Sequence, residues 1–257
     1  MIDYHIHTTF SDGRSSHEDY IEAAVEKKLD EIGFSDHVCL REVDWAMKLS
    51  DAPAMVKKVT NLKKESRISV KLGVEMDFFP GMEDKINEFT RKYPFDYVIG
   101  SVHHIGGWTF DDSRQAHGYD LWDIDDLYKL YFSLVQKAAK SGLFNILGHP
   151  DVVKKFGHKP ERSIYNLLNE AASVLRDNNV CIELNSSGLI KPCKEIYPSR
   201  QFLEICHSKG VQITFGSDAH SSERIAGDFD QVIKLAKDVG YEKIASFTGR
   251  KRDLVKI

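Results

Sequence analysis

The sequence predicts an α/β fold in which parallel strands alternate with helices and close into a barrel, with residues 1–257 forming a single domain. Seven apolar, strand-like runs alternate with segments of helical periodicity. No linker rich in Gly, Pro or Ser divides the chain. Polar residues suited to chemistry follow nearly every strand-like run, and a closed barrel brings all strand ends to one face. An open doubly wound sheet is the alternative, and it would gather only the strand ends near its switch point.

The expected strands are short and apolar, and most of them end at a histidine, an acid or an amide. In chain order they cover residues 2–6, 32–34, 69–76, 95–99, 144–147, 180–184 and 211–215, and a last short strand is expected at 244–247. The basic tail beyond it carries no clear pattern.

Helices are expected between these strands. Ser15 and Glu18 fit a capping box at the start of the first helix. Apolar residues then recur at helical spacing within 20–25, 55–62, 82–89, 124–135, 164–175, 202–206 and 225–235. Each helix can therefore cover a parallel strand as a right-handed crossover.

Charge and cysteine content exclude several classes of function. The chain has 35 Lys and Arg against 39 Asp and Glu, a net charge of -4, and the charges are scattered, so no nucleic-acid or membrane partner is expected. Four cysteines lack Cys-x-x-Cys spacing, which predicts reduced thiols and a cytoplasmic location. We expect neither an export signal nor a membrane span, because no apolar run approaches about 18 residues.

Nine side chains at the expected strand ends are candidate metal ligands. His5 and His7 alternate with apolar residues, so both lie on one side of a strand, and Asp218 and His220 repeat their spacing. The complete set is His5, His7, Asp12, His37, Glu75, His103, His149, Asp218 and His220. Imidazole nitrogens and carboxylate oxygens suit zinc, manganese or iron, and no cysteine stands among them to indicate a thiolate site.

This number of ligands predicts two or three divalent ions, because one catalytic zinc needs about three protein ligands. Clustered ions stabilise the entering and departing oxygens of a displacement at phosphorus. Hydrolysis of a phosphate ester by a metal-bridging hydroxide is therefore the expected reaction, with Glu75, Asp218 and His220 as catalytic residues.

Other histidines and acids are assigned structural roles. A single histidine at a strand end is more often structural than a ligand, and strand alternation points His104 away from His103. The histidines without strand-end placement are expected to be solvated: His17, His117, His158 and His207. Four acids are expected to orient ligands or cap helices: Asp3, Asp36, Asp77 and Asp151.

Six short motifs together resemble the polymerase and histidinol phosphatase (PHP) superfamily. They are His5-x-His7, Ser35-Asp36-His37, Gly73-Val74-Glu75, Ser101-Val102-His103, Gly148-His149-Pro150-Asp151 and Ser217-Asp218-x-His220. Segments 101–111 and 185–199 resemble the monofunctional histidinol-phosphate phosphatases of histidine biosynthesis. The resemblance covers residues 1 to about 220 and implies a distorted, TIM-like (β/α)7 barrel, a trinuclear metal centre, and hydrolysis of L-histidinol phosphate to L-histidinol and inorganic phosphate.

The resemblance also implies which residues share each ion. The first set is His5, His7, Glu75 and Asp218; the second is Glu75, His103 and His149; the third is Asp12, His37 and His220. Glu75 would bridge the first two ions. Ile190 departs from the family pattern, which has an arginine there, so the phosphate contact from this loop is in question.

Substrate contacts are assigned to five residues. Lys191 is a candidate replacement for the missing arginine, and Arg162 and Arg200 are further cations that could hold phosphate oxygens. Trp108 is expected in a loop that covers the substrate, where Asp111 (with Asp112 beside it) would recognise the substrate amine.

Two other functions stay open at this point. One is a phosphoesterase of broad specificity, acting on nucleotides, DNA ends or other phosphomonoesters; the other is a metal-binding barrel without turnover. The sequence leaves open whether the chain forms a homodimer and which group protonates the leaving alkoxide.

Overall fold

Parallel strands form the centre of the molecule, as a computed structural model of all 257 residues shows. One sheet has the order β1-β2-β4 and a second has the order β11-β10-β9-β6-β5-β3. The strands are β1 (Ile2–Asp3), β2 (Glu31–Phe34), β3 (His37–Val38), β4 (Ser69–Leu72), β5 (Glu75–Asp77), β6 (Ile99–Ser101), β9 (Ile146–Leu147), β10 (Cys181–Asn185) and β11 (Ile213–Gly216). All pairings within these two sheets are parallel.

The two sheets join into one barrel of seven strand positions: β1, β2–β3, β4–β5, β6, β9, β10 and β11. Backbone hydrogen bonds from Tyr4 N to Phe215 O (3.1 Å) and from His7 N to Ala219 O (2.9 Å) close the ring between the first and last positions. The expected strand 69–76 is interrupted at Gly73 and Val74, and the ladder of the first strand ends at Asp3. These breaks distort the barrel, and the predicted fold class is confirmed.

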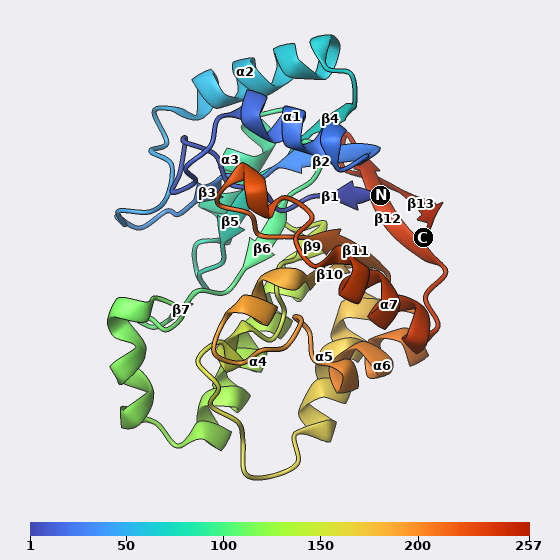
Figure 1. Cartoon of the computed structure of the whole chain (residues 1–257). Coiled ribbons are helices and arrows are strands. Elements are labelled where there is room, and N and C mark those ends of the chain that lie inside the picture. The colour runs from blue at the N-terminus through green and yellow to red at the C-terminus, as the bar shows by residue number, and fades with distance from the viewer.

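A helix follows each strand position. The helices are α1 (His17–Glu26), α2 (Ala52–Glu65), α3 (Glu83–Lys92), α4 (Ile124–Lys140), α5 (Tyr165–Asp177), α6 (Arg200–Ser208) and α7 (Phe229–Val239). In Figure 1, α1 and α2 lie on one side of the strands and α4 to α7 on the other. None of the helices is both long and apolar enough to cross a bilayer.

Helix starts follow local capping chemistry. The capping box of α1 is made by Ser16 and Asp19, one residue later than the sequence predicted, and each accepts a hydrogen bond from the other's backbone N–H. Asp123 and Ser199 cap α4 and α6 through their side-chain oxygens, without the reciprocal bond of a capping box. These caps determine the residues at which the three helices begin.

The end of the barrel opposite the strand C-termini is closed by an antiparallel hairpin of β12 (Lys243–Thr248) and β13 (Lys251–Lys256). The expected strand at 244–247 is confirmed, whereas the tail that carried no pattern forms β13. The backbone N–H of Phe247 donates to Tyr4 Oη (3.1 Å), which ties the hairpin to the first strand. Tyr97 fills the barrel interior nearby, with its hydroxyl donating to Tyr4 O (2.7 Å).

His17 is buried, contrary to the expectation that it is solvated. Its ring lies 4.5 Å from the ring of Phe34 and 5.7 Å from that of Phe10, and its Nε2 atom has no hydrogen-bond partner. The side chain lies on the inward face of α1, so helical periodicity, which the sequence analysis did not apply to this residue, explains its burial.

Candidate metal centre

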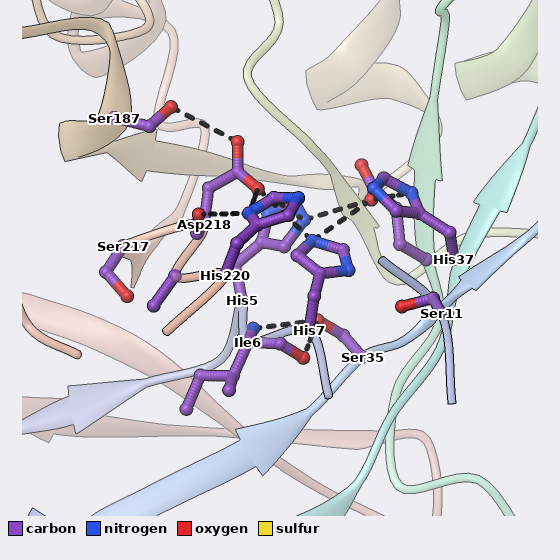
Figure 2. A network of polar contacts seen from close by, with 12 residues as sticks. His5, Ile6, His7, Ser11, Ser35, His37, Ser187, Ser217, Asp218 and His220 are labelled. Carbon is purple, nitrogen blue, oxygen red and sulfur yellow. Dashed lines mark hydrogen bonds and ion pairs between the residues drawn. The ribbon is translucent and has the colours of Figure 1, made fainter. Parts of the chain in front are cut away.

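The C-terminal ends of the strand positions bring all nine predicted ligands to one mouth of the barrel. His37 and Glu75 begin β3 and β5, and the others lie in the segments that follow β1, β6, β9 and β11. Figure 2 shows five of them facing one another: His5, His7, His37, Asp218 and His220. Convergence at this face is what a closed parallel barrel requires.

The carboxylate of Glu75 lies in the middle of the histidines. Its Oε1 atom is 3.0 Å from His149 Nε2 and 3.5 Å from His103 Nε2, and its Oε2 atom is 3.1 Å from His5 Nε2 and 2.7 Å from His37 Nδ1. The two oxygens thus face different groups of imidazoles. A single carboxylate so placed can bridge two cations.

Asp218 forms a second carboxylate corner of the cluster. Its Oδ1 atom is 3.1 Å from His7 Nε2 and 3.8 Å from His5 Nε2, and its Oδ2 atom accepts a hydrogen bond from Ser187 Oγ (3.2 Å). The backbone of Asp218 is left-handed, with φ 53°, a conformation that aspartate tolerates better than most non-glycine residues.

Asp12 reaches the cluster from the loop after β1. It lies 3.3 Å from His220 Nε2 and 3.8 Å from His37 Nε2. His7, Asp12, His37 and His220 each offer a ligand atom within 4.8 Å of the others. This group is the most exposed part of the cluster, since the side chains of Asp12 and His220 are 33% and 36% accessible.

The charges of the cluster lower the pKa of its central carboxylate and shift the pKa values of its imidazoles in opposite directions. Burial raises the pKa of Glu75, but His5, His37 and His103 lower it more, so the net pKa is well below its usual range. The pKa of His103 rises to about 10, because Asp77 and other carboxylates outweigh the effect of burial. Burial, and then the positive charges of His37 and His220, lower the pKa of His7 to about 3. The cluster therefore attracts positive charge but cannot protonate every ring.

Unpartnered buried atoms show that this cluster fits metal ions. His5 Nε2, both ring nitrogens of His7, His37 Nδ1 and Glu75 Oε2 are buried without a hydrogen-bond partner. Leaving such atoms unsatisfied costs about 1–3 kcal/mol each, and cations at the centre would satisfy Glu75 Oε2 and one nitrogen of each imidazole.

Glu183 is a functional residue that the sequence analysis missed. It lies on β10, is 1% exposed, and its Oε1 atom is 2.7 Å from His5 Nδ1. Gly216 makes room for it, since a Cβ at that position would lie 1.7 Å from Glu183 Oε1. Asp77 holds His103 in the same way, with 2.5 Å between Oδ1 and Nδ1. Such carboxylates fix the ring and its tautomer and make the opposite nitrogen a better ligand.

A cavity of about 690 Å³ opens over the cluster. His37, His103, His149, Asp218 and His220 lie at its base. Around them are five basic side chains: Arg14, Arg114, Lys155, Lys191 and Arg224. Asp111 and Asp112 also line the cavity, so basic side chains outnumber acidic ones around the metal ligands, which suits a small anionic substrate.

Three of the predicted substrate contacts lie outside this cavity. The side chain of Arg162 is 79% exposed and pairs with Asp125, and that of Arg200 is 52% exposed and pairs with Glu204 and Asp238. Both predictions placed a cation near a strand end by sequence distance alone, whereas the side chains point away along the surface. Trp108 also does not line the cavity: its indole N–H donates to Gln115 O (3.0 Å), and Gly118 packs against its ring.

Asp111 and Lys191 do line the cavity, and so does Ile190 at the position of the missing arginine. Lys155, which the sequence analysis did not select, is the residue beside Asp111: its Nζ donates to Asp111 O (2.6 Å) and lies 3.3 Å from Asp111 Oδ2. Trp45 contributes a ring 4.7 Å from the ring of His37. No local pattern distinguished Lys155 or Trp45 in the sequence, because both reach the cavity from long connections.

Comparisons with known proteins show the family to which this chain belongs. A family model described as "PHP domain" matches residues 3–187. A protein of Deinococcus radiodurans named "Probable histidinol-phosphatase" is 33% identical over 93% of this chain and 94% of its own length. The histidinol-phosphatase of Bacillus subtilis is 28% identical, over 86% of this chain and 93% of its own length. The crystal structure of histidinol phosphate phosphatase from Lactococcus lactis, complexed with zinc, L-histidinol and phosphate, matches with a TM-score of 0.86 and 26% identity, covering 98% of both chains.

Proposed function

Because this chain belongs to the PHP domain family, we propose that it is a histidinol-phosphatase, an enzyme that hydrolyses L-histidinol phosphate to L-histidinol and inorganic phosphate. Relatives that match this chain over nearly its whole length carry this name. The observation that supports the proposal most strongly is the central position of Glu75, between two groups of imidazoles and under a basic cavity.

We assign the metal ligands to three groups. His5, His7, Glu75 and Asp218 would hold one ion; Glu75, His103 and His149 a second; Asp12, His37 and His220 a third. Support comes from the spacing of these atoms and from their lack of other partners. Zinc, manganese and iron all suit such ligands, and zinc is bound by the Lactococcus lactis enzyme. When bound, divalent ions of this kind lower the pKa of water and neutralise phosphoryl oxygens.

The chain's own side chains would bind and orient the substrate. Lys155 and Lys191 lie at the cavity, where a phosphate group could accept their charge-assisted hydrogen bonds. Asp111 offers a carboxylate for the substrate amine and is held in place by Lys155. Of the residues proposed as catalytic, Asp218 and His220 line the cavity, whereas Glu75 is buried and contacts His37 and His149, which line it.

Glu75→Gln tests the proposal. The change removes the bridging charge, so phosphate release from L-histidinol phosphate should fall by at least about 100-fold. Glu204→Gln, a matched change on the exposed surface of α6, should retain the wild-type rate. Release that is unaffected by Glu75→Gln would contradict the proposed site. Equal turnover of nucleoside monophosphates by the wild-type protein would instead favour a broad phosphoesterase.

Three further proposals concern the domain organisation, the cellular location and the oligomeric state. We propose that residues 1–257 act as one PHP-type barrel domain, supported by a continuous core of 70 buried residues. We also propose a cytoplasmic location, which the four free cysteines and the proposed biosynthetic role support. A homodimer is open to test by light scattering.

A further inference from the structure

A second group of metal-ligand side chains lies beside the candidate metal centre and belongs to none of its three ligand groups. Cys39, Asp77 and His104 each offer one ligand atom, and these atoms lie within 4.8 Å of one another. All three residues are buried, with exposures of 7%, 1% and 7%. Only one of the three atoms comes from a residue that contacts a proposed ligand, since Asp77 also holds His103.

The strand register brings these residues together. β3 pairs with β5 so that His37 lies opposite Glu75 and Val38 opposite Met76. The next position along this ladder places Cys39 beside Asp77, and both side chains point to the same side of the sheet as His37 and Glu75. His104 arrives from β7 (His104–Ile105), which follows β6. The pairing of β3 with β5 thus places His37 and Glu75 in the candidate metal centre and brings Cys39 and Asp77 together beyond them.

Two of the three ligand atoms lack any other partner. Asp77 Oδ2 and His104 Nε2 lie 3.1 Å apart and pair with each other, but neither atom has a hydrogen-bond partner outside this group. Ligand atoms around a tetrahedral zinc lie roughly 3.3–3.8 Å apart, so a small outward movement would admit an ion. A bound ion would satisfy both buried atoms, which have no partner outside this group.

Each of the three side chains also contacts a neighbouring group that fixes its orientation. The backbone N–H of Arg41 donates to Cys39 Sγ (3.4 Å), His103 Nδ1 lies 2.5 Å from Asp77 Oδ1, and Thr109 Oγ1 lies 3.2 Å from His104 Nδ1. Metal-binding residues typically have such outer partners, which fix the tautomer of the histidine and leave the other nitrogen free for the metal.

We propose that Cys39, Asp77 and His104 bind one divalent cation of the zinc class, at a site separate from the candidate metal centre. One sulfur, one oxygen and one nitrogen donor suit zinc or cobalt, and a water could fill the fourth position. Binding displaces the thiol proton to solvent, leaving a thiolate–metal bond. The rings of Phe79 and Trp45 lie 5.0 and 6.1 Å from that of His104 and shield the site from bulk water.

Cobalt substitution tests the site without relying on activity. The full-length protein is stripped with a chelator and reloaded with Co²⁺, and its absorbance spectrum is recorded. A thiolate ligand gives a near-ultraviolet charge-transfer band, which nitrogen and oxygen ligands cannot give. All nine ligands of the candidate metal centre are nitrogen or oxygen donors, so the wild-type band would report a cysteine.

The band should be present in wild type and in Cys193→Ser, the control, and absent in Cys39→Ser. Metal content of Cys39→Ser should fall by about one equivalent. His104→Asn keeps the thiol and should weaken the band, which supplies a second variant if Cys39→Ser does not fold. A wild-type protein without the band would overturn the proposal, and so would a band that survives in Cys39→Ser.

Discussion

Substituting Glu183 with Gln should weaken metal binding at the candidate metal centre, although Glu183 is not a proposed ligand. Its Oε2 atom accepts hydrogen bonds from the backbone N–H of His149 (2.8 Å) and from Asn185 Nδ2 (3.0 Å). In the variant these donors require the amide oxygen, so the amide NH2 group faces His5 Nδ1. That nitrogen must then accept, which moves the ring proton to Nε2, the atom that faces Glu75.

Loss of an outer carboxylate partner of a metal-binding histidine typically lowers metal affinity by about 10- to 100-fold, which corresponds to about 1.4–2.8 kcal/mol. The assay is a zinc titration of chelator-treated protein, followed by hydrolysis of p-nitrophenyl phosphate. The half-saturating zinc concentration should rise by that factor, while Glu204→Gln should titrate like wild type. A Glu183→Gln protein with unchanged zinc affinity would refute the role assigned to this carboxylate.

Three other predictions concern residues around the barrel. Burial lowers the pKa of His17 from 6.5 to about 4, so between pH 6.5 and 4 the unfolded chain binds more protons than the folded one and stability falls as the pH drops. His17→Phe should remove up to about 3 kcal/mol of this acid destabilisation, measured by urea unfolding across this pH range. A variant with the wild-type pH dependence of stability would contradict this prediction. Lys155→Met should lower kcat/KM for L-histidinol phosphate by about 10- to 100-fold through one lost charge-assisted hydrogen bond; wild-type kinetics would exclude a phosphate contact. Arg162→Ala and Arg200→Ala should leave kcat/KM unchanged, because both side chains are exposed and outside the cavity; a large loss in either would restore the original assignment.

The fold could be predicted because its signals are local and repeated. Apolar runs that alternate with segments of helical periodicity indicate a parallel barrel, whatever the exact register between the strands. The interruption at Gly73 and Val74 could not be predicted, since the run from 69 to 76 reads as one strand and the break depends on packing against neighbouring positions. The strand β13 could not be predicted because it is basic and exposed, so it has no buried face that would require apolar residues to alternate with polar ones.

The candidate ligands could be selected because each one follows or begins a strand, and barrel geometry then decides where it points. Glu183 had a weaker signal that went unused: an acid between Ile182 and Leu184 in a fully buried strand requires a partner. Lys155 had none, because its role depends on contact with a loop 44 residues away in sequence. Arg162 and Arg200 were selected for their nearness in sequence to strand ends, which does not determine side-chain direction, and both lie outside the cavity.

Anomalous scattering from zinc-soaked crystals tests the central claim most directly. Data collected at the zinc absorption edge should show peaks at coordination distance from the carboxylate of Glu75, one toward His5 and His7 and another toward His103 and His149. If the carboxylate of Glu75 has no such peak while zinc binds elsewhere on the protein, these strand ends do not form a metal centre and the hydrolytic function proposed for them is wrong.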